Sequence, residues 1–212
     1  MFATNCWILA SSKGSECVIV DPGMPDVSHE VSAICDENNL KPVAVLATHG
    51  HLDHTYSIRA IADGYEIPTL VHPEDRVLLT NPERAVSSEF AATFINEKFS
   101  ESNLIREVKN GEKLNLLGLD FEVIHAPGHT RGSIMFKVNS EVLISGDVLF
   151  QGSIGRTDLP TGSSEAMFET LRKKVLPLSD SLRVLPGHGP ETTIGAERKY
   201  NSYLKQANNG GY

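Results

Sequence analysis

The chain has 212 residues, which is enough for one sizeable core but too few for two large independent domains. Hydrophobic residues make up 40% and charged residues 22% of the chain, an ordinary balance that excludes a disordered or collagen-like protein. The formal net charge of -8 argues against a nucleic-acid partner, because binding a phosphate backbone needs an extensive cluster of Lys and Arg. No apolar run approaches the ~18 residues that a membrane-spanning helix needs, so we expect no membrane partner either.

The amino-terminal residues 1–10 have no basic residue before their apolar stretch and no small-residue cleavage site, so they do not resemble a signal peptide. Cys6, Cys17 and Cys35 are an odd number without CxxC spacing, which fits reduced thiols better than a disulfide framework. We therefore expect a cytoplasmic protein. The sequence leaves its oligomeric state open between a monomer and a small homo-oligomer.

The first half of the chain alternates between predicted strands and helices. Short apolar runs predict strands at residues 6–10, 16–20, 42–47 and 69–71. Apolar side chains at helical spacing predict helices at residues 26–39 and 53–63. From residue 73 to 104 the pattern weakens, and Phe90, Phe94 and Phe99 indicate helical pieces that form a lid or substrate wall.

The second half has a similar content and ends in a short polar tail. Strands are predicted at residues 119–125, 133–138, 141–145 and 182–185. Helices are predicted at residues 164–176 and 194–207. The two halves, roughly 1–118 and 119–207, predict one α/β domain over residues 1–212, in which two αβ layers pack sheet to sheet.

The segment 48–54, THGHLDH, lies where a predicted buried strand ends and a helix begins. Residues two apart in an extended segment point the same way, so His49 and His51 project together. The next helical turn brings Asp53 and His54 beside them, while Gly50 leaves room for a close backbone path. Imidazole and carboxylate groups are common zinc ligands, and the shortage of nearby Cys favours a catalytic site over a closed structural one. This spacing disfavours the alternative of a solvated, histidine-rich loop.

Three more candidate ligands each follow the end of a predicted strand: His129, Asp147 and His188. Strand ends are the rim at which α/β sheets build their sites. We therefore expect these three side chains to face one cleft together with the segment 48–54.

The pattern HxHxDH, followed by a distant His, Asp and His, resembles the metallo-β-lactamase superfamily over nearly the whole chain. The resemblance implies a four-layer αβ/βα sandwich with two divalent metal ions between its sheets, zinc in the first place and iron or manganese as alternatives. It implies seven ligands. His49, His51 and His129 would bind the first ion, and Asp53, His54 and His188 would bind the second. Asp147 would bridge the two ions. Asp21 matches an aspartate that supports the ligand loop without binding metal.

Within the superfamily, residues 149–158 and 192–198 resemble the glyoxalase II branch in its short form. This resemblance implies hydrolysis of a thioester such as S-lactoylglutathione, or of a related thiol conjugate, by a hydroxide that bridges the metals. Two divalent ions keep a net positive charge after Asp53, Asp147 and the hydroxide have neutralised part of it. This positive charge would stabilise an anionic tetrahedral intermediate. Asp53 and Asp147 are thus catalytic candidates that act through the metals, and a thiolate leaves easily because thiols are fairly acidic.

Substrate contacts are harder to predict. Arg198 and Lys199 are the nearest basic candidates for the carboxylates of a thiol carrier, against the alternative of exposed helix charges. Arg156 and Asp158 are expected to pin a loop instead of touching substrate.

Three rival functions remain: a persulfide dioxygenase with a single iron, a lactonase or esterase on the same scaffold, and a metal-binding module without turnover. Residues 186–190 disfavour the dioxygenase, because such enzymes resemble this chain less well around the last histidine.

Overall fold

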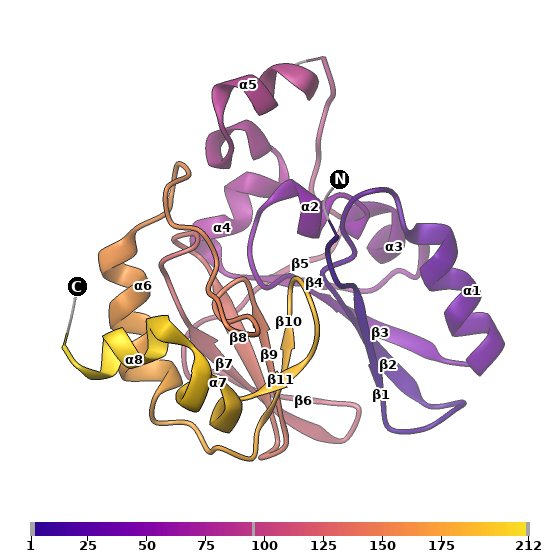
Figure 1. Ribbon diagram of the computed structural model, residues 1–212. Helices are drawn as coiled ribbons and strands as arrows, with labels where there is room; N and C mark the ends of the chain where they lie inside the picture. Colours follow the sequence, from indigo (N-terminus) through magenta and orange to yellow (C-terminus); the bar gives the residue numbers. More distant parts are fainter. Residues whose placement is uncertain (1–2, 95, 211–212) are drawn as a thin grey trace.

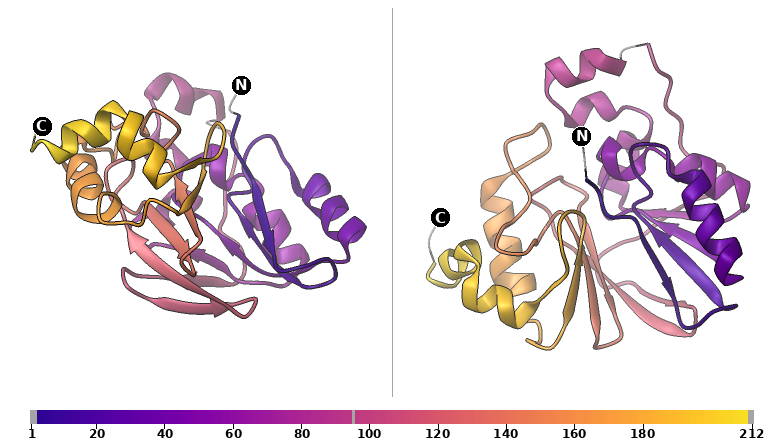
Figure 2. Two further views of the ribbon diagram at one scale, coloured as in Figure 1. Left: turned by 60° about the horizontal axis from the view of Figure 1, so that its bottom comes forward. Right: turned by 45° about the vertical axis from the view of Figure 1, so that its right-hand side comes forward.

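Two β-sheets face each other at the centre of the structure, and helices cover their outer faces (Figure 1 and Figure 2). The computed structural model describes residues 3–94 and 96–210. The resulting order of layers, helix, sheet, sheet and helix, confirms the predicted four-layer αβ/βα sandwich. None of the helices within these residues combines the length and the apolar character that a membrane span requires.

The first sheet has the strand order β1-β2-β3-β4-β5. Its strands are β1 (Trp7–Ala10), β2 (Glu16–Val20), β3 (Lys41–Leu46), β4 (Thr69–Val71) and β5 (Ile105–Glu107). β1 and β2 form an antiparallel hairpin, whereas β2 to β5 run parallel. The crossovers between parallel strands carry α1 (Ser28–Asn38) and α3 (Ile58–Gly64). The carboxyl ends of β2, β3 and β4 therefore meet at one edge of the sheet.

The second sheet has the strand order β11-β10-β9-β8-β7-β6 and is mostly antiparallel. Its strands are β6 (Lys113–Leu116), β7 (Leu119–His125), β8 (Ile134–Val138), β9 (Val142–Gly146), β10 (Arg183–Pro186) and β11 (Thr192–Thr193). The covering helices are α6 (Ser164–Thr170), which continues as a π-helical turn, α7 (Ile194–Tyr200) and α8 (Ser202–Asn208). The second sheet begins at Lys113, and β6 and β7 form its first hairpin.

Alternation along the strands divides the apolar core into three layers. On β2, Val18 and Val20 pack between the sheets, whereas Cys17 and Ile19 pack under the helices of the first sheet. Phe121 and Phe136 are fully buried between the sheets, where each stabilises the fold by roughly 1.5–3 kcal/mol. The sheets are thus joined by a continuous apolar layer below the edge that carries the polar loops.

Two predicted helices are each interrupted by a polar side chain that binds a distant loop. The predicted helix 53–63 is divided into α2 (Leu52–Thr55) and α3. At the break, the Ser57 hydroxyl donates to Gly23 O at 2.8 Å and accepts from Val27 N at 3.0 Å. The predicted helix 194–207 is divided at Asn201, whose side chain caps α8 and donates to Ser153 O at 3.0 Å.

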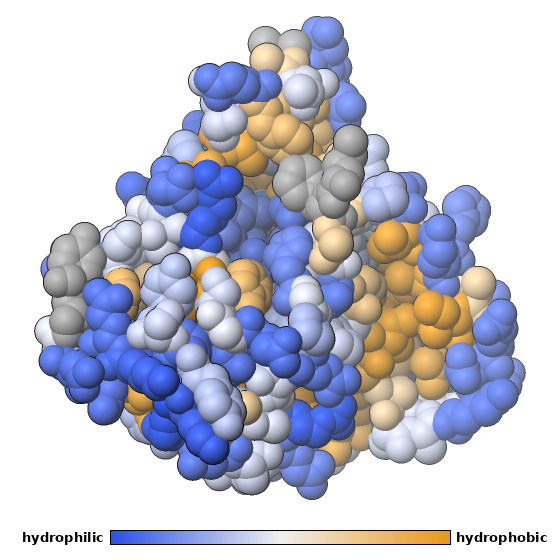
Figure 3. Space-filling model, in the orientation of Figure 1, coloured by the Kyte–Doolittle hydropathy of each residue, from blue (hydrophilic) through white to orange (hydrophobic). Residues whose placement is uncertain are grey.

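Helical pieces follow β4 and rise above the sheets, as the weak pattern of residues 73–104 predicts (Figure 1). They include α4 (Pro73–Arg76), α5 (Ser88–Ala91) and three short 3-10 turns. We call residues 82–94 and 96–99 the lid segment. Phe94 makes edge-to-face contacts with Phe90 and Phe99 at ring-centre distances of 5.4 and 5.6 Å, which hold this segment together. Figure 3 shows apolar side chains gathered there, at the top of the molecule.

Candidate metal centre

The structure brings all seven predicted ligand residues together at the edge where the strands of both sheets end. His49 and His51 lie in the loop after β3, and Asp53 and His54 lie on α2, the helix that follows. The second sheet supplies the others from loops after β7, β9 and β10: His129, Asp147 and His188. Residues far apart in the sequence therefore meet because strand ends of both sheets share one edge.

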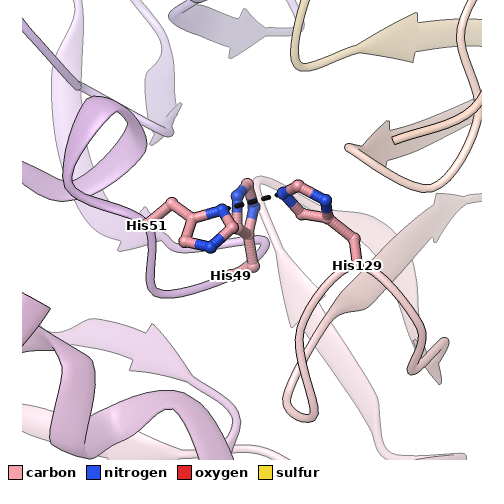
Figure 4. A group of neighbouring side chains, drawn as sticks. All are labelled: His49, His51 and His129. Carbon is pink, nitrogen blue, oxygen red and sulfur yellow. Dashed lines mark hydrogen bonds between the residues drawn. The ribbon is translucent and has the colours of Figure 1, made fainter. Parts of the chain in front are cut away.

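The first group consists of His49, His51 and His129, all of them buried (Figure 4). One nitrogen from each ring lies within 4.8 Å of the others. His51 Nδ1 and His129 Nε2, which come from loops of opposite sheets, are 2.8 Å apart. Two imidazole nitrogens at this distance need a proton or a cation between them, because two lone pairs repel each other.

The second group consists of Asp53, His54 and His188, whose ligand atoms also lie within 4.8 Å of one another. Asp147 lies between the two groups. One of its oxygens is 3.4 Å from His54 Nε2, and the other is 3.4 Å from His188 Nε2 and 3.5 Å from His129 Nε2. This carboxylate thus contacts members of both groups, as a bridging ligand must.

Three buried atoms of this cluster have no hydrogen-bond partner among the described residues: His49 Nε2, His51 Nε2 and Asp147 Oδ1. Leaving a buried polar atom unsatisfied costs about 1–3 kcal/mol. A bound cation removes that cost for the atoms it coordinates, and imidazole with carboxylate is a donor set that suits zinc and iron. The residues present therefore fit divalent metal ions.

Neighbouring groups orient the imidazoles. Asp21 accepts hydrogen bonds from Thr48 N at 2.7 Å and from the Thr48 hydroxyl at 2.6 Å, and it lies 3.0 Å from His54 Nδ1. These contacts fit a supporting role for Asp21, but its carboxylate also forms a third group with His49 and His54 whose ligand atoms lie within 4.8 Å of one another. His129 Nδ1 donates to Arg156 O at 2.7 Å, and His188 Nδ1 similarly faces the Ala3 carbonyl. Each bond leaves Nε2 directed toward the cluster.

The electrostatics differ between the two groups. Burial lowers the pKa of His51 to about 3 and that of His129 to about 4, so both rings are neutral at pH 7, the form that binds metal. Burial alone would also lower the pKa of His54, but the carboxylates of Asp147 and Asp21 outweigh it and raise the pKa to about 9. Positive charge is therefore favoured at His54, beside the carboxylates of Asp147 and Asp21.

A cavity of about 490 Å³ opens onto this cluster. Its wall is largely apolar, and the lid segment contributes to it as predicted; the apolar lining residues are Leu52, Val86, Phe90, Phe150 and Leu159. Arg156 is the one lysine or arginine in the described lining, and it binds Asp158 through two hydrogen bonds of 2.8 and 2.7 Å. Both side chains are exposed and belong to one loop, so this pair does not fasten the loop to the core, and the expected structural role stays a prediction.

Arg198 and Lys199 are not brought to this cavity. The Arg198 guanidinium donates to Asp180 at 2.7 Å and to two carbonyls, those of Leu176 and Leu178, at 2.7 and 2.8 Å. Lys199 is exposed, with Nζ 4.9 Å from the ring centre of Tyr200. The geometry therefore gives Arg198 a structural role on α7 and offers no support for the predicted substrate contacts.

Sequence reasoning missed Glu197, which supports the cavity wall from behind. Its buried carboxylate accepts hydrogen bonds from Gly152 N at 2.7 Å, the Thr192 hydroxyl at 2.7 Å and Asn201 Nδ2 at 2.9 Å. It thereby fixes the turn that follows Phe150. The available signal is helical spacing, since Glu197 and Asn201 continue a stripe that is otherwise apolar.

Known proteins resemble the chain over most of its length. A family model described as the metallo-beta-lactamase superfamily matches residues 1–188. Hydroxyacylglutathione hydrolase GloC of Haemophilus influenzae is 36% identical, over 96% of this chain and 93% of that protein. The solved structure of BLEG-1 B3 metallo-beta-lactamase is 34% identical with a TM-score of 0.83, covering 95% of this chain and 94% of that one. That of TTHA1623 in a di-iron-bound form is 32% identical with a TM-score of 0.77, covering 94% of each chain. The chain therefore belongs to the metallo-beta-lactamase superfamily of metal-binding hydrolases.

Proposed function

We propose that the chain is a binuclear metal-dependent hydrolase of thioesters. The observation that carries this proposal is the contact of Asp147 with both groups of ligand-type side chains, at the floor of a cavity with an apolar wall. In this proposal each group binds one ion and Asp147 bridges them. The similarity to a protein named hydroxyacylglutathione hydrolase supports a thioester as substrate.

The residues of the site have distinct tasks in this reaction. When bound, two divalent ions polarise a carbonyl group and lower the pKa of a water molecule. Asp21 holds His54 with Nε2 facing the cluster, and the Arg156 carbonyl does the same for His129. Phe90 and Phe150 keep bulk water away from the reacting carbonyl, which strengthens the electrostatic interactions inside.

The cavity lining favours a thioester over an oxygen ester. Among its described residues there is no Lys, Tyr or Cys that could donate a proton to a leaving group. A thiol, with a pKa near ~8.5, leaves as a thiolate without such a donor. An alkoxide is a far stronger base and needs one, so thioesters suit this lining better.

Zinc is the proposed metal, with iron as the alternative. The donor set suits both metals, and the similar protein TTHA1623 was solved in a di-iron-bound form. The rival function is a dioxygenase whose single iron is held by two His and one Asp. A single iron would leave the complete second group, Asp53, His54 and His188, without a metal ion, which disfavours this function.

Metal analysis combined with a substrate panel tests this proposal. We expect two metal ions per chain and a kcat/KM for S-lactoylglutathione at least about tenfold above those for simple esters and lactones. A chelator should abolish turnover, and added zinc or iron should restore it. Asp147→Ala should lose nearly all activity, whereas Asp36→Asn, which alters an exposed carboxylate of α1, should retain it. One iron per chain with oxygen uptake that depends on glutathione persulfide would refute the proposal, as would full activity of Asp147→Ala.

A further inference from the structure

A buried carboxylate outside the predicted ligand set, Asp75 on α4, lies between the two loops that carry the first histidine group. It is 1% exposed. Asp75 Oδ2 accepts hydrogen bonds from Gly50 N at 2.8 Å and from the Thr130 hydroxyl at 2.6 Å. Asp75 Oδ1 accepts one from Gly132 N at 2.7 Å. Both oxygens thus act as acceptors.

These partners are the immediate neighbours of metal-ligand candidates. Gly50 lies between His49 and His51, and Thr130 follows His129. One carboxylate therefore fixes a loop of the first sheet and a loop of the second sheet at once. The approach of His51 to His129, 2.8 Å between ring nitrogens, depends on how these two loops are held.

Both loops approach α4 so closely that only glycine fits. A Cβ atom on Gly132 would lie 2.6 Å from Asp75 Cγ. One on Gly50 would lie 2.6 Å from Leu78 Cβ and 2.9 Å from the Asp75 carbonyl oxygen. The close backbone path predicted at Gly50 therefore runs against α4 and the 3-10 turn that contains Leu78.

The charge of Asp75 has no stabilising cation nearby. None of the ion pairs among the described residues includes Asp75, and burial raises the pKa of its carboxyl, an effect that the hydrogen bonds oppose. A neutral side chain could fill the same space at lower electrostatic cost. A buried carboxylate, however, accepts hydrogen bonds through both oxygens and binds the N–H and O–H donors of both loops more strongly than a neutral group does.

We propose that Asp75 is a positioning residue, which holds the loops of the two sheets so that His49, His51 and His129 form a ready-made set of ligands for the first metal ion. This inference rests on the metal-binding part of the proposed function and not on the choice of a thioester. Its consequence is that Asp75 sets metal affinity although it is not itself a ligand.

The test compares Asp75→Asn with Thr69→Val. An asparagine keeps the shape, but its amide nitrogen must face a donor, so it cannot satisfy both loops. Thr69→Val is the control. It removes a buried hydrogen bond of 2.7 Å between Thr69 and Ser102, which belong to the same half of the chain as Asp75 but not to the ligand loops. Affinity for Zn²⁺ is measured by competition with a chromophoric chelator, and the cobalt-substituted proteins give a visible spectrum. Urea unfolding of the chelated proteins gives their stability.

We expect Asp75→Asn to bind one of its two Zn²⁺ ions about 10–100-fold more weakly and to show an altered cobalt spectrum, while both ions of Thr69→Val stay within about twofold of the wild type. Wild-type affinity and spectrum in Asp75→Asn would overturn the inference. So would an equal loss of affinity in both variants at equal loss of stability, since that is a merely structural effect. If the wild type itself binds no metal, the proposed function fails as well.

If Asp75→Asn does not fold, Thr130→Val decides. It removes the hydroxyl that donates to Asp75 and also contacts Ser133. We expect a smaller loss of Zn²⁺ affinity, about 3–10-fold, because one of the three hydrogen bonds to the carboxylate is lost. Unchanged affinity would overturn the inference in this case too.

Discussion

Glu197→Ala should lower the free energy of unfolding by about 2–4 kcal/mol. The carboxylate accepts three hydrogen bonds, and a bond to a charged group contributes roughly 1.5–3 kcal/mol. The loss should be smaller than the sum over the three hydrogen bonds, because water can reach Gly152 N and the half-buried Thr192 hydroxyl in the variant. Asn201 is fully buried, but its side chain keeps Ser153 O as a partner. About half of the sum therefore remains.

Urea unfolding of the chelated protein measures this loss. For a chain of this length, about 3 kcal/mol corresponds to a fall of roughly 6–12 °C in Tm. Glu197→Gln should fall between alanine and the wild type, because one acceptor oxygen remains. Glu191→Ala is the matched control, since its exposed ion pair with Arg183 should contribute at most about 1 kcal/mol. A loss below about 0.5 kcal/mol in Glu197→Ala would refute the assigned role.

Three further predictions concern the cavity, the thiols and α7. Phe90→Ala should raise KM for thioesters with bulky apolar acyl groups about tenfold, with a smaller effect on S-lactoylglutathione; equal effects in steady-state kinetics would contradict the lid assignment. Burial raises the pKa of Cys6 and of Cys17 to about 12, so a thiol reagent at pH 8 should label the native chain at least about 100-fold more slowly than the unfolded chain; comparable rates would argue against this. Arg198→Ala should lower Tm while kcat/KM stays within about twofold; a tenfold loss of kcat/KM would restore its predicted contact with substrate.

The elements that could be predicted are those determined by local pattern. The HxHxDH spacing, at the end of a continuous apolar strand, indicates a convergent group because strand and helix geometry act over a few residues. β5 and β6 were not predicted, since both are short and half-exposed and so lack a clear apolar alternation. The roles of Asp75 and Glu197 depend on distant partners, because Thr130 lies 55 residues from Asp75 and Gly152 lies 45 residues from Glu197. Helical spacing places Glu197 and Asn201 on one face of the predicted helix, but it carries no information about the distant contacts with Gly152 and Thr130.

The substrate prediction was weak for a related physical reason. The charge of Arg198 and its position in the sequence predict a contact with substrate, whereas the direction of its side chain depends on how α7 packs. In the folded chain the guanidinium turns toward the carbonyls that follow the π-helical turn. A count of basic residues cannot distinguish a side chain that caps its own scaffold from one that reaches a ligand.

The first histidine group joins residues 78 positions apart, His51 and His129, across the seam between the sheets. An ion held by both therefore acts as a removable cross-link. By the loop-closure relation used for disulfides, closing a loop of this size is worth about 4.5 kcal/mol. Metal loss would accordingly loosen the seam before the interior of either sheet, and proteolysis of depleted protein should begin in the loops at that edge.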